Sequence, residues 1–250
     1  MTRTDDEGPF GDQAAAVELL WGSPRRPGRG PKPAMSVERI ADAAIAVADA
    51  DGLAAVSMQR VAGELGFTKM ALYRYVPGKT ELVALMADVA IGGPPALTGA
   101  PHDWRTRLID WAHHLLAAFL RHPWLLGATV GPRIMGPNEL GWMECALAAL
   151  AATELSGGER LDTVAVVAGH IRSMAQQMGA TDRPEAALSS PLVALMRTHS
   201  ERYPELTAAL ASTTTEGGQD DALDFGLHAI LDGIGLLVAR RTEGSGAATS

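Results

Sequence analysis

Polar side chains able to bind a polyanion gather in one short stretch of the chain. Within about three helical turns the sequence places Thr68, Lys69, Tyr73, Arg74, Tyr75 and Lys79. Lysine and arginine neutralise phosphate charge, and the hydroxyl groups of threonine and tyrosine bond to phosphates or to base edges. A helix N-terminus adds a further preference for an anion. These residue types therefore point to recognition of a nucleic acid.

Two short helices joined by a turn are expected to position these side chains. Ser57 has the type and position of an N-cap, and apolar residues follow it at helical spacing, which predicts a helix over 58–65. Gly66 ends that helix, and Thr68 caps a second one over 69–76. This arrangement, the reader (residues 57–79), has the layout of a helix-turn-helix motif. An ordinary helical hairpin with a solvated charged face is the alternative.

The segment Ser36 to Ile91 resembles the DNA-binding domain of the TetR family of bacterial transcriptional regulators. The likeness is carried by DADGLAAVS at the end of a first helix, by LGFTKMALYRYV, and by GKTELVALM at the start of a fourth helix over 80–91. The resemblance implies an all-α protein with an N-terminal helix-turn-helix domain and a C-terminal helical domain that binds a ligand and dimerises. The composition, 47% apolar residues with few β-branched runs, also favours helices throughout.

The resemblance also implies roles for individual reader residues. Thr68, Lys69 and Met70 would approach base edges and set the choice of sequence, whereas phosphate contacts would set affinity. The residues implied in phosphate or backbone contacts are Tyr73, Tyr75, Lys79, Ser57, Gln59 and Arg60. Arg74 is a further DNA-binding candidate by its residue type.

The charge of the chain is distributed unevenly. Its formal net charge of -8 at pH 7 is unfavourable for binding a polyanion. Residues 24–80 nevertheless hold nine Lys or Arg against five Asp or Glu, a local excess of +4, and the remainder is acidic. The basic residues therefore coincide with the predicted DNA-binding domain.

A segment rich in proline and glycine precedes this domain. It carries four basic residues, Arg25, Arg26, Arg29 and Lys32. Such a composition does not fold by itself, so the extension 1–34 is predicted to be disordered or partly ordered, with a basic arm. The arm could follow phosphates or enter a narrow minor groove, and a solubilising linker is the alternative. The apolar stretch 13–21 is too short to span a membrane and lacks a basic flank, so a cytoplasmic protein is expected.

Nothing in the sequence indicates catalysis, a metal site or a cofactor. The single cysteine, Cys145, excludes an intrachain disulfide, and the seven histidines form no motif around it. His113 and His114 are adjacent, so on a helix their rings diverge and do not form a ready metal site.

Helices are also predicted after the linker at Gly92 to Pro95. A long one ends before Pro123, a short one begins there, and a third starts near Asn138. The predicted domains are the DNA-binding domain over 35–92, a ligand-binding and dimerisation domain over 100–241, and a disordered tail over 242–250.

Two later helices carry apolar residues at three- and four-residue steps, which is typical of helix-helix seams. The seam residues predicted to form a four-helix dimer interface are Leu161, Val164, Ala168, Ile171, Leu223, Leu227, Ile230 and Ile234. Glycines inside the second helix, Gly226 among them, suggest close helix approach. A dimer with two-fold symmetry would match a two-fold symmetric DNA site. Burial of both faces of each helix inside one chain is the alternative.

Large or adaptable apolar side chains within 103–178 could form an effector site. The candidates are Trp111, His114, Leu115, Trp124, Met135, Trp142, Met143, His170, Met174 and Met178. Ordinary core packing is the alternative for each of them. The segment from Asp103 to Leu126 and the GPR turn at 131–133 resemble the tetracycline-repressor-like subclass. Where that repressor places an asparagine and a magnesium-binding histidine, this chain has Trp111 and Thr129, so a more apolar effector is expected.

Together these features predict a homodimeric, ligand-responsive regulator, a repressor of a palindromic double-stranded operator. A small-molecule enzyme would need a nucleophile, a base and a group that orients it, and no such set is recognisable. A helical adaptor would bind protein, and its retention on DNA would not depend on salt.

Overall fold

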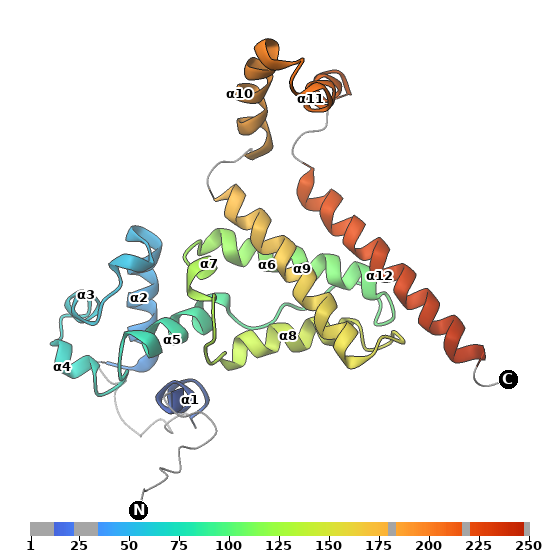
Figure 1. Ribbon diagram of the computed structural model, residues 1–250. Helices are drawn as coiled ribbons and strands as arrows, with labels where there is room; N and C mark the ends of the chain where they lie inside the picture. Colours follow the sequence, from blue (N-terminus) through green and yellow to red (C-terminus); the bar gives the residue numbers. More distant parts are fainter. Residues whose placement is uncertain (1–12, 23–34, 180–183, 217–220, 248–250) are drawn as a thin grey trace, which may run out of the picture. The chain divides into compact units, whose positions relative to one another are not determined.

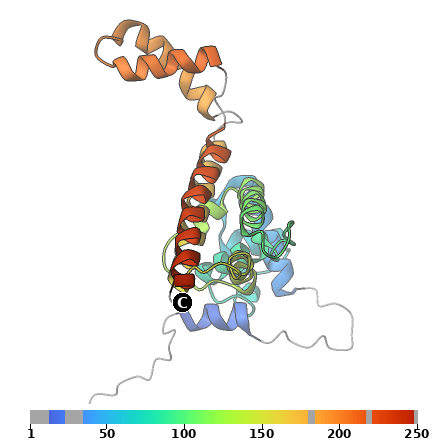
Figure 2. The same ribbon diagram turned by 90° about the vertical axis from the view of Figure 1, so that its right-hand side faces the viewer.

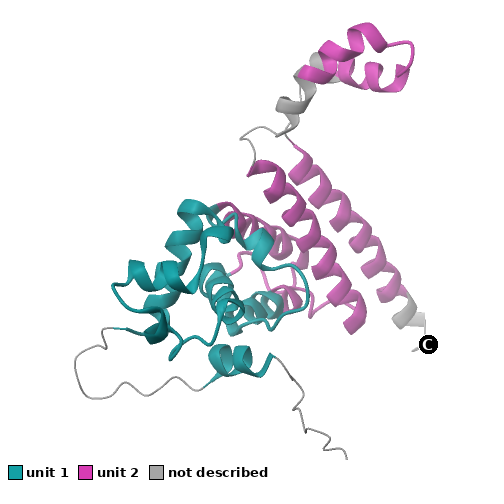
Figure 3. Cartoon of the chain, turned by 60° about the vertical axis from the view of Figure 1, so that its left-hand side comes forward, with its two compact units in different colours: residues 1–96, 121–145 teal, residues 97–120, 146–250 magenta. Residues whose placement is uncertain are grey.

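The computed structural model describes residues 13–22, 35–179, 184–216 and 221–247. These residues form helices and connecting turns, with no strand among them (Figure 1). The all-α prediction is therefore confirmed. The chain divides into two compact units, one of residues 1–96 and 121–145 and the other of residues 97–120 and 146–250 (Figure 3). The first unit thus includes segment 121–145, which was predicted to belong to the C-terminal domain over 100–241.

The first unit is organised around α2 (Val37–Asp51) and α5 (Lys79–Ile91), which pack against each other. Between them in sequence lie the short 3-10 helix η2 (Leu53–Ala55), α3 (Met58–Glu64) and α4 (Lys69–Leu72). The side chains without solvent exposure come from all four α-helices and include Ile40, Val61, Leu72, Leu82 and Met86. This common core holds the two reader helices.

The helix α5 is apolar all round, and such a helix needs neighbours on several sides. It lies against α2, against α7 (Leu125–Ala128) and against α1 (Ala14–Trp21). The indole N–H of Trp21 donates to the carbonyl oxygen of Met135 at 3.0 Å. The N-terminal extension therefore contains a helix that covers α5, a role that the sequence did not reveal.

The second unit contains a pair of long helices that run side by side, α9 (Gly157–Met178) and α12 (Ala222–Ala247) (Figures 1 and 3). Figure 2 shows α12 as one continuous helix. The remaining helices of this unit are α6 (Trp104–Arg121, whose last residue falls in the first unit), α10 (Pro184–His199) and α11 (Pro204–Glu216). The helix α8 (Pro137–Ala149) contributes residues to both units.

Two predicted boundaries differ from the structure. The second reader helix, predicted over 69–76, ends at Leu72, because the N–H of Tyr75 bonds to the Leu72 carbonyl at 2.9 Å and closes a tighter turn. Pro77 also disfavours helical backbone at the residue before it. At the other end, α12 continues to Ala247, so residues 242–247 are helical where a disordered tail was predicted.

Candidate nucleic-acid interface and effector-responsive region

Both reader helices begin with a side-chain cap. The Ser57 hydroxyl oxygen accepts the N–H of Arg60 at 3.1 Å, and the Thr68 hydroxyl oxygen accepts the N–H of Ala71 at 3.3 Å. Each cap satisfies a donor that the first helical turn would leave unpaired. Gly66 joins the two helices at φ 72°, a conformation that favours glycine.

The reader presents one polar face to solvent and buries the other. Leu72 and Val76 have no exposed surface, whereas Tyr73 is 37% exposed and Met70 is 72% exposed. The other exposed side chains are those of Gln59, Arg60, Thr68, Lys69, Arg74 and Lys79, while Ser57 and Tyr75 are half-buried. The structure thus brings together the predicted DNA-contacting residues of segment 57–79 on one small element.

Lys69 and Tyr73 lie one helical turn apart and interact. The Lys69 ammonium lies 5.4 Å from the centroid of the Tyr73 ring, within range of a cation-π contact. This contact orients the ammonium over an aromatic ring that is itself on the exposed face.

Arg60 differs from the other basic residues of this face. Its guanidinium pairs with Glu64 at 3.0 Å and with Asp51 at 2.8 Å. The hydrogen bonds that Arg60 donates to Glu64 and Asp51 raise the pKa of Arg60 above its ordinary value. Because its charge is already balanced locally, Arg60 offers less to a phosphate than Lys79 does.

An ionic cluster in the first unit links α5 to the start of α8. The buried Asp88 carboxylate accepts the N–H of Glu139 at 3.0 Å, and Glu139 forms a two-bond ion pair with Arg133. Burial raises the pKa of Asp88, and the neighbouring Glu139 charge adds to that rise. A Cβ at Gly136 would lie 2.2 Å from the Asp88 carboxyl group, so glycine is required for this close approach.

A second polar contact in the same unit connects α2 with the segment that follows α6. One oxygen of the Asp49 carboxylate accepts the Trp124 indole N–H at 2.7 Å and lies 2.8 Å from Nδ1 of His122. The helix that supports the reader is therefore bonded directly to the segment 121–128.

The predicted effector residues divide between the two units. Trp124, Met135, Trp142 and Met143 lie in the first, whereas Trp111, His114, Leu115, His170, Met174 and Met178 lie in the second. Several have structural partners of their own. The Trp142 indole N–H donates to the Gly92 carbonyl at 3.0 Å, and His170 Nε2 lies 2.9 Å from the Leu223 carbonyl. Trp111 and Leu115 are buried, and His114 is exposed.

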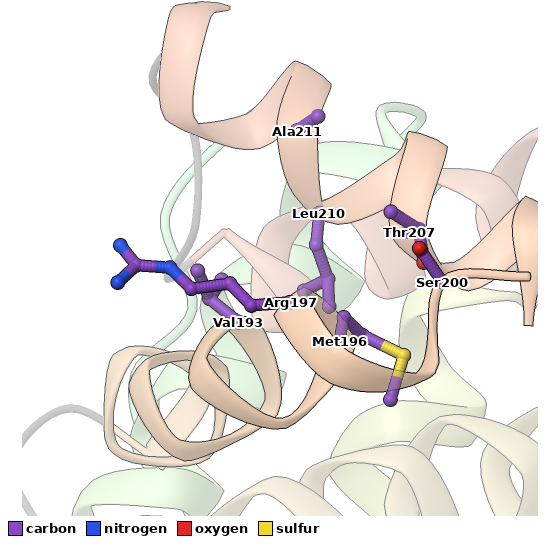
Figure 4. Close-up of a pocket in the computed structure, with 7 residues that line it drawn as sticks. All are labelled: Val193, Met196, Arg197, Ser200, Thr207, Leu210 and Ala211. Carbon is purple, nitrogen blue, oxygen red and sulfur yellow. The ribbon is translucent and has the colours of Figure 1, made fainter.

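A pocket of about 230 Å³ lies elsewhere, within the hairpin of α10 and α11. Its lining residues are Val193, Met196, Arg197, Ser200, Thr207, Leu210 and Ala211 (Figure 4). None of them belongs to the predicted effector set. The Arg197 guanidinium extends away from Met196 and Ser200.

The residues of the predicted dimer seam differ in their exposure within the single chain. Val164, Ile171 and Leu227 are buried in this chain, in which α9 and α12 pack against each other. Ala168, Leu223, Ile230 and Ile234 are half-buried, and Leu161 is half exposed. Close approach is confirmed at Gly226, where an added Cβ would lie 2.4 Å from the His170 ring. The buried positions of this seam contribute to the contact between α9 and α12 within one chain, and the role of the seam in a dimer stays a prediction.

Two further predictions concern the basic arm and metal binding. The basic arm residues Arg25, Arg26, Arg29 and Lys32 lie outside the described residues. Within the described part of the chain, no three His, Cys, Asp or Glu side chains are grouped so as to hold a metal ion.

Comparisons with known proteins identify the class to which this reader belongs. A family model described as bacterial regulatory proteins, tetR family, matches residues 36–86, and one described as tetracyclin repressor-like, C-terminal domain, matches residues 98–238. The chain is 40% identical to the HTH-type transcriptional repressor DrrR1 of Streptomyces coeruleorubidus, over 92% of this chain and 88% of that protein.

Solved structures show the same fold. Apo ActR from Streptomyces coelicolor superposes with a TM-score of 0.72 at 23% identity, covering 86% of this chain and 100% of ActR. ActR in complex with actinorhodin gives a TM-score of 0.70 at 24% identity, covering 81% and 96% of the two chains. The chain belongs to the TetR family of bacterial transcriptional regulators. It is therefore a regulator rather than an enzyme, and it shares the family's properties of binding DNA operators, dimerising and responding to small molecules.

Proposed function

We propose that this protein is a cytoplasmic, homodimeric repressor that leaves a palindromic operator when a largely apolar small molecule binds its C-terminal domain. The observation that carries this proposal is a reader with polar and basic side chains exposed on one face and a fully buried apolar face behind them. The similarity to the repressor DrrR1 covers most of both chains and supports repression rather than activation.

The reader residues divide into two groups under this proposal. Thr68, Lys69 and Met70, at the start of the second helix, face base edges. Tyr73, Tyr75 and Lys79 hold phosphates, together with Arg74, Ser57 and Gln59 at the edge of the same face. Arg60 contributes least, because Asp51 and Glu64 already neutralise it. The arm residues 25–32 add phosphate contacts outside the reader.

The second copy of the chain covers the outer face of α9 and α12. Phe225 is 77% exposed, Leu236 is 64% exposed and Val166 is 53% exposed, although all three are apolar. Between the two large α12 residues lie Ala229 and Gly233, which are also exposed and leave room for a partner side chain. A self-complementary face of this kind suits a two-fold dimer.

The same face explains why α12 is unusually apolar. Its segment Ala222–Glu243 is long and apolar enough to cross a membrane, with a mean hydropathy of 1.6 and only 11% of its residues buried. In a dimer this exposed apolar surface becomes a protein interface.

The effector acts through α5 in this proposal. The buried contact of Asp88 with Glu139 and the bond of Asp49 to Trp124 join the helices of the reader domain to segment 121–145. Effector binding that favours one arrangement of this segment would change the separation of the two reader copies. A coupling of about 1 to 3 kcal/mol is typical of such systems and requires unequal affinity for two conformations. The complex of ActR with actinorhodin supports a small-molecule effector for this chain.

Selection of bound duplexes from a random pool tests the proposal. The expected result is a palindromic consensus whose half-sites are separated by about 34 to 36 Å, one turn of DNA, or a multiple of it. Binding should weaken steeply as salt rises, because phosphate neutralisation releases counterions. Salt-independent retention, or no preferred sequence, would favour the adaptor alternative.

Two substitutions separate the proposed groups. Lys79→Ala should weaken binding to all duplexes alike, whereas Thr68→Asn, which keeps a capping side chain, should change the ranking of operators. Binding competition against a panel of single-base operator variants measures both effects. Equal losses from both substitutions on every duplex would contradict the division of labour.

A further inference from the structure

Met70 is an apolar side chain displayed on a polar reader. It is the second residue of α4 and is 72% exposed, whereas Leu72 and Val76 of the same reader have no exposed surface. Met70 thus contributes nothing to the core that supports the helix. An apolar group held in water at the functional surface gains free energy only when a partner covers it.

The two residues before Met70 are tied to the reader itself. The Thr68 hydroxyl oxygen accepts the Ala71 N–H as a cap, and the Lys69 ammonium lies over the Tyr73 ring. Among the described contacts, Met70 has neither a hydrogen-bond partner nor a ring partner. It is therefore the residue of this group that is most free to meet a ligand.

The surroundings of Met70 decide what kind of partner covers it. Lys69, Arg74 and Lys79 are exposed on the same reader, so the partner is a polyanion rather than an apolar protein surface. The major groove displays one apolar group, the C5 methyl of thymine. The flexible methionine side chain adapts readily to such a small group.

We propose that Met70 is a specificity-determining residue that packs on the C5 methyl of a thymine in each operator half-site. This inference rests on the proposed DNA-reading function, and it names the chemical group of the operator that Met70 contacts. The same methyl group is present in 5-methylcytosine, so the contact is with a C5-methylated pyrimidine and not with the Watson-Crick edge of the base.

The test removes single methyl groups from an operator obtained by selection. Each thymine is replaced in turn by deoxyuridine, symmetrically in both half-sites, and the Kd of the full-length dimer is measured. One symmetric pair of replacements should weaken wild-type binding about fifteenfold, since each buried methyl contributes about fourfold. The same T·A pair is also replaced by C·G and, in a second duplex, by 5-methyl-C·G. The second duplex should bind more tightly than the first, because it carries the C5 methyl group.

Variants of Met70 assign the effect to this side chain. In Met70→Ala the ratio of Kd values for the uracil and thymine duplexes should fall to about one, whereas Met70→Leu, which keeps the apolar volume, should retain a ratio well above one. Lys79→Ala is the matched control, because losing a phosphate contact weakens both duplexes and leaves the ratio unchanged.

The outcomes are distinct. Sequence-selective binding that ignores every methyl removal, or an equal ratio in wild type and Met70→Ala, overturns the role of Met70 and leaves the DNA-reading function standing. A failure to select any duplex overturns both.

Discussion

The reader domain and the α9–α12 pair differ in how much of their apolar surface is exposed to solvent. In α2 to α5 the large aliphatic side chains Ile40, Leu72 and Leu82 have no exposed surface, so this core is complete within one chain. In α12 the large side chains Phe225 and Leu236 remain mostly exposed although the helix is packed along its other side. The core of the small reader domain is therefore complete in one chain, whereas the long helices leave an apolar face that we propose a second copy covers.

The largest effect is expected from breaking the face that needs a partner. Phe225→Asp places a charge on the exposed apolar stripe of α12, so dimers should dissociate and operator affinity should fall about 100-fold or more through loss of two-site binding. Analytical ultracentrifugation and operator titration measure the two effects. Leu195→Asp, at an exposed apolar position of α10, is the matched control and should remain dimeric. A dimeric Phe225→Asp variant with normal affinity would refute the assignment of this face.

A large effect is also expected from opening the core of the reader. Leu72→Ala removes a fully buried side chain, so the free energy of unfolding of the first unit should fall by about 2 to 5 kcal/mol. Urea unfolding followed by circular dichroism measures this loss. Met70→Ala, two residues away and exposed, should change stability by less than about 0.5 kcal/mol. Similar losses in both variants would mean that the two faces of the reader are not distinct.

A medium effect is expected at the start of α9. The Ser156 hydroxyl oxygen accepts the Glu159 N–H at 3.3 Å, while the Glu159 carboxylate accepts the Ser156 N–H at 2.8 Å. Removing this reciprocal cap by Ser156→Ala should cost about 1 kcal/mol in thermal or urea unfolding. Ser173→Ala, on an exposed position of the same helix, is the control. Equal behaviour of the two variants would show that α9 is held by its packing alone.

The smallest effect is expected from the Asp88 carboxylate and depends on pH. Because burial raises the pKa of Asp88 in the folded protein, the folded state binds its proton more tightly, and stability falls as pH rises above the ordinary value. Asp88→Asn removes this titration. Its free energy of unfolding should therefore decline less than that of the wild type between pH 4 and pH 7.

Asp42→Asn, at an exposed position of α2, is the control for the pH experiment. Identical pH profiles for the wild type and Asp88→Asn would show that burial beside Glu139 does not raise the pKa of Asp88.

The sequence predicted the elements whose signals are local. Ser57, Gly66 and Thr68 mark the ends of the reader helices by their own chemistry, and the structure places all three as expected. The seam of α9 and α12 was predicted as a pattern, and its assignment to a dimer interface stays a prediction. Heptad spacing shows that a helix is covered along one side, and it carries no information on whether the covering helix belongs to the same chain.

Contacts between residues far apart in the chain were not predictable in the same way. The bond of Asp49 to Trp124 and the approach of Asp88 to Glu139 each join segments separated by at least 50 residues. No periodicity records such a pair. The helix at 14–21 was seen as an apolar stretch, but its partner on α5 could be found only from the fold.

The position of α1 limits how α5 can tilt. With α1, α2 and α7 against it, α5 cannot lean toward any of them without displacing a neighbour. A tilt of α5 toward α1 would also strain the bond between the Trp21 indole and the Met135 carbonyl, because Trp21 is the last residue of α1. We therefore expect α1 to resist the movement of α5 that the proposed response to the effector requires.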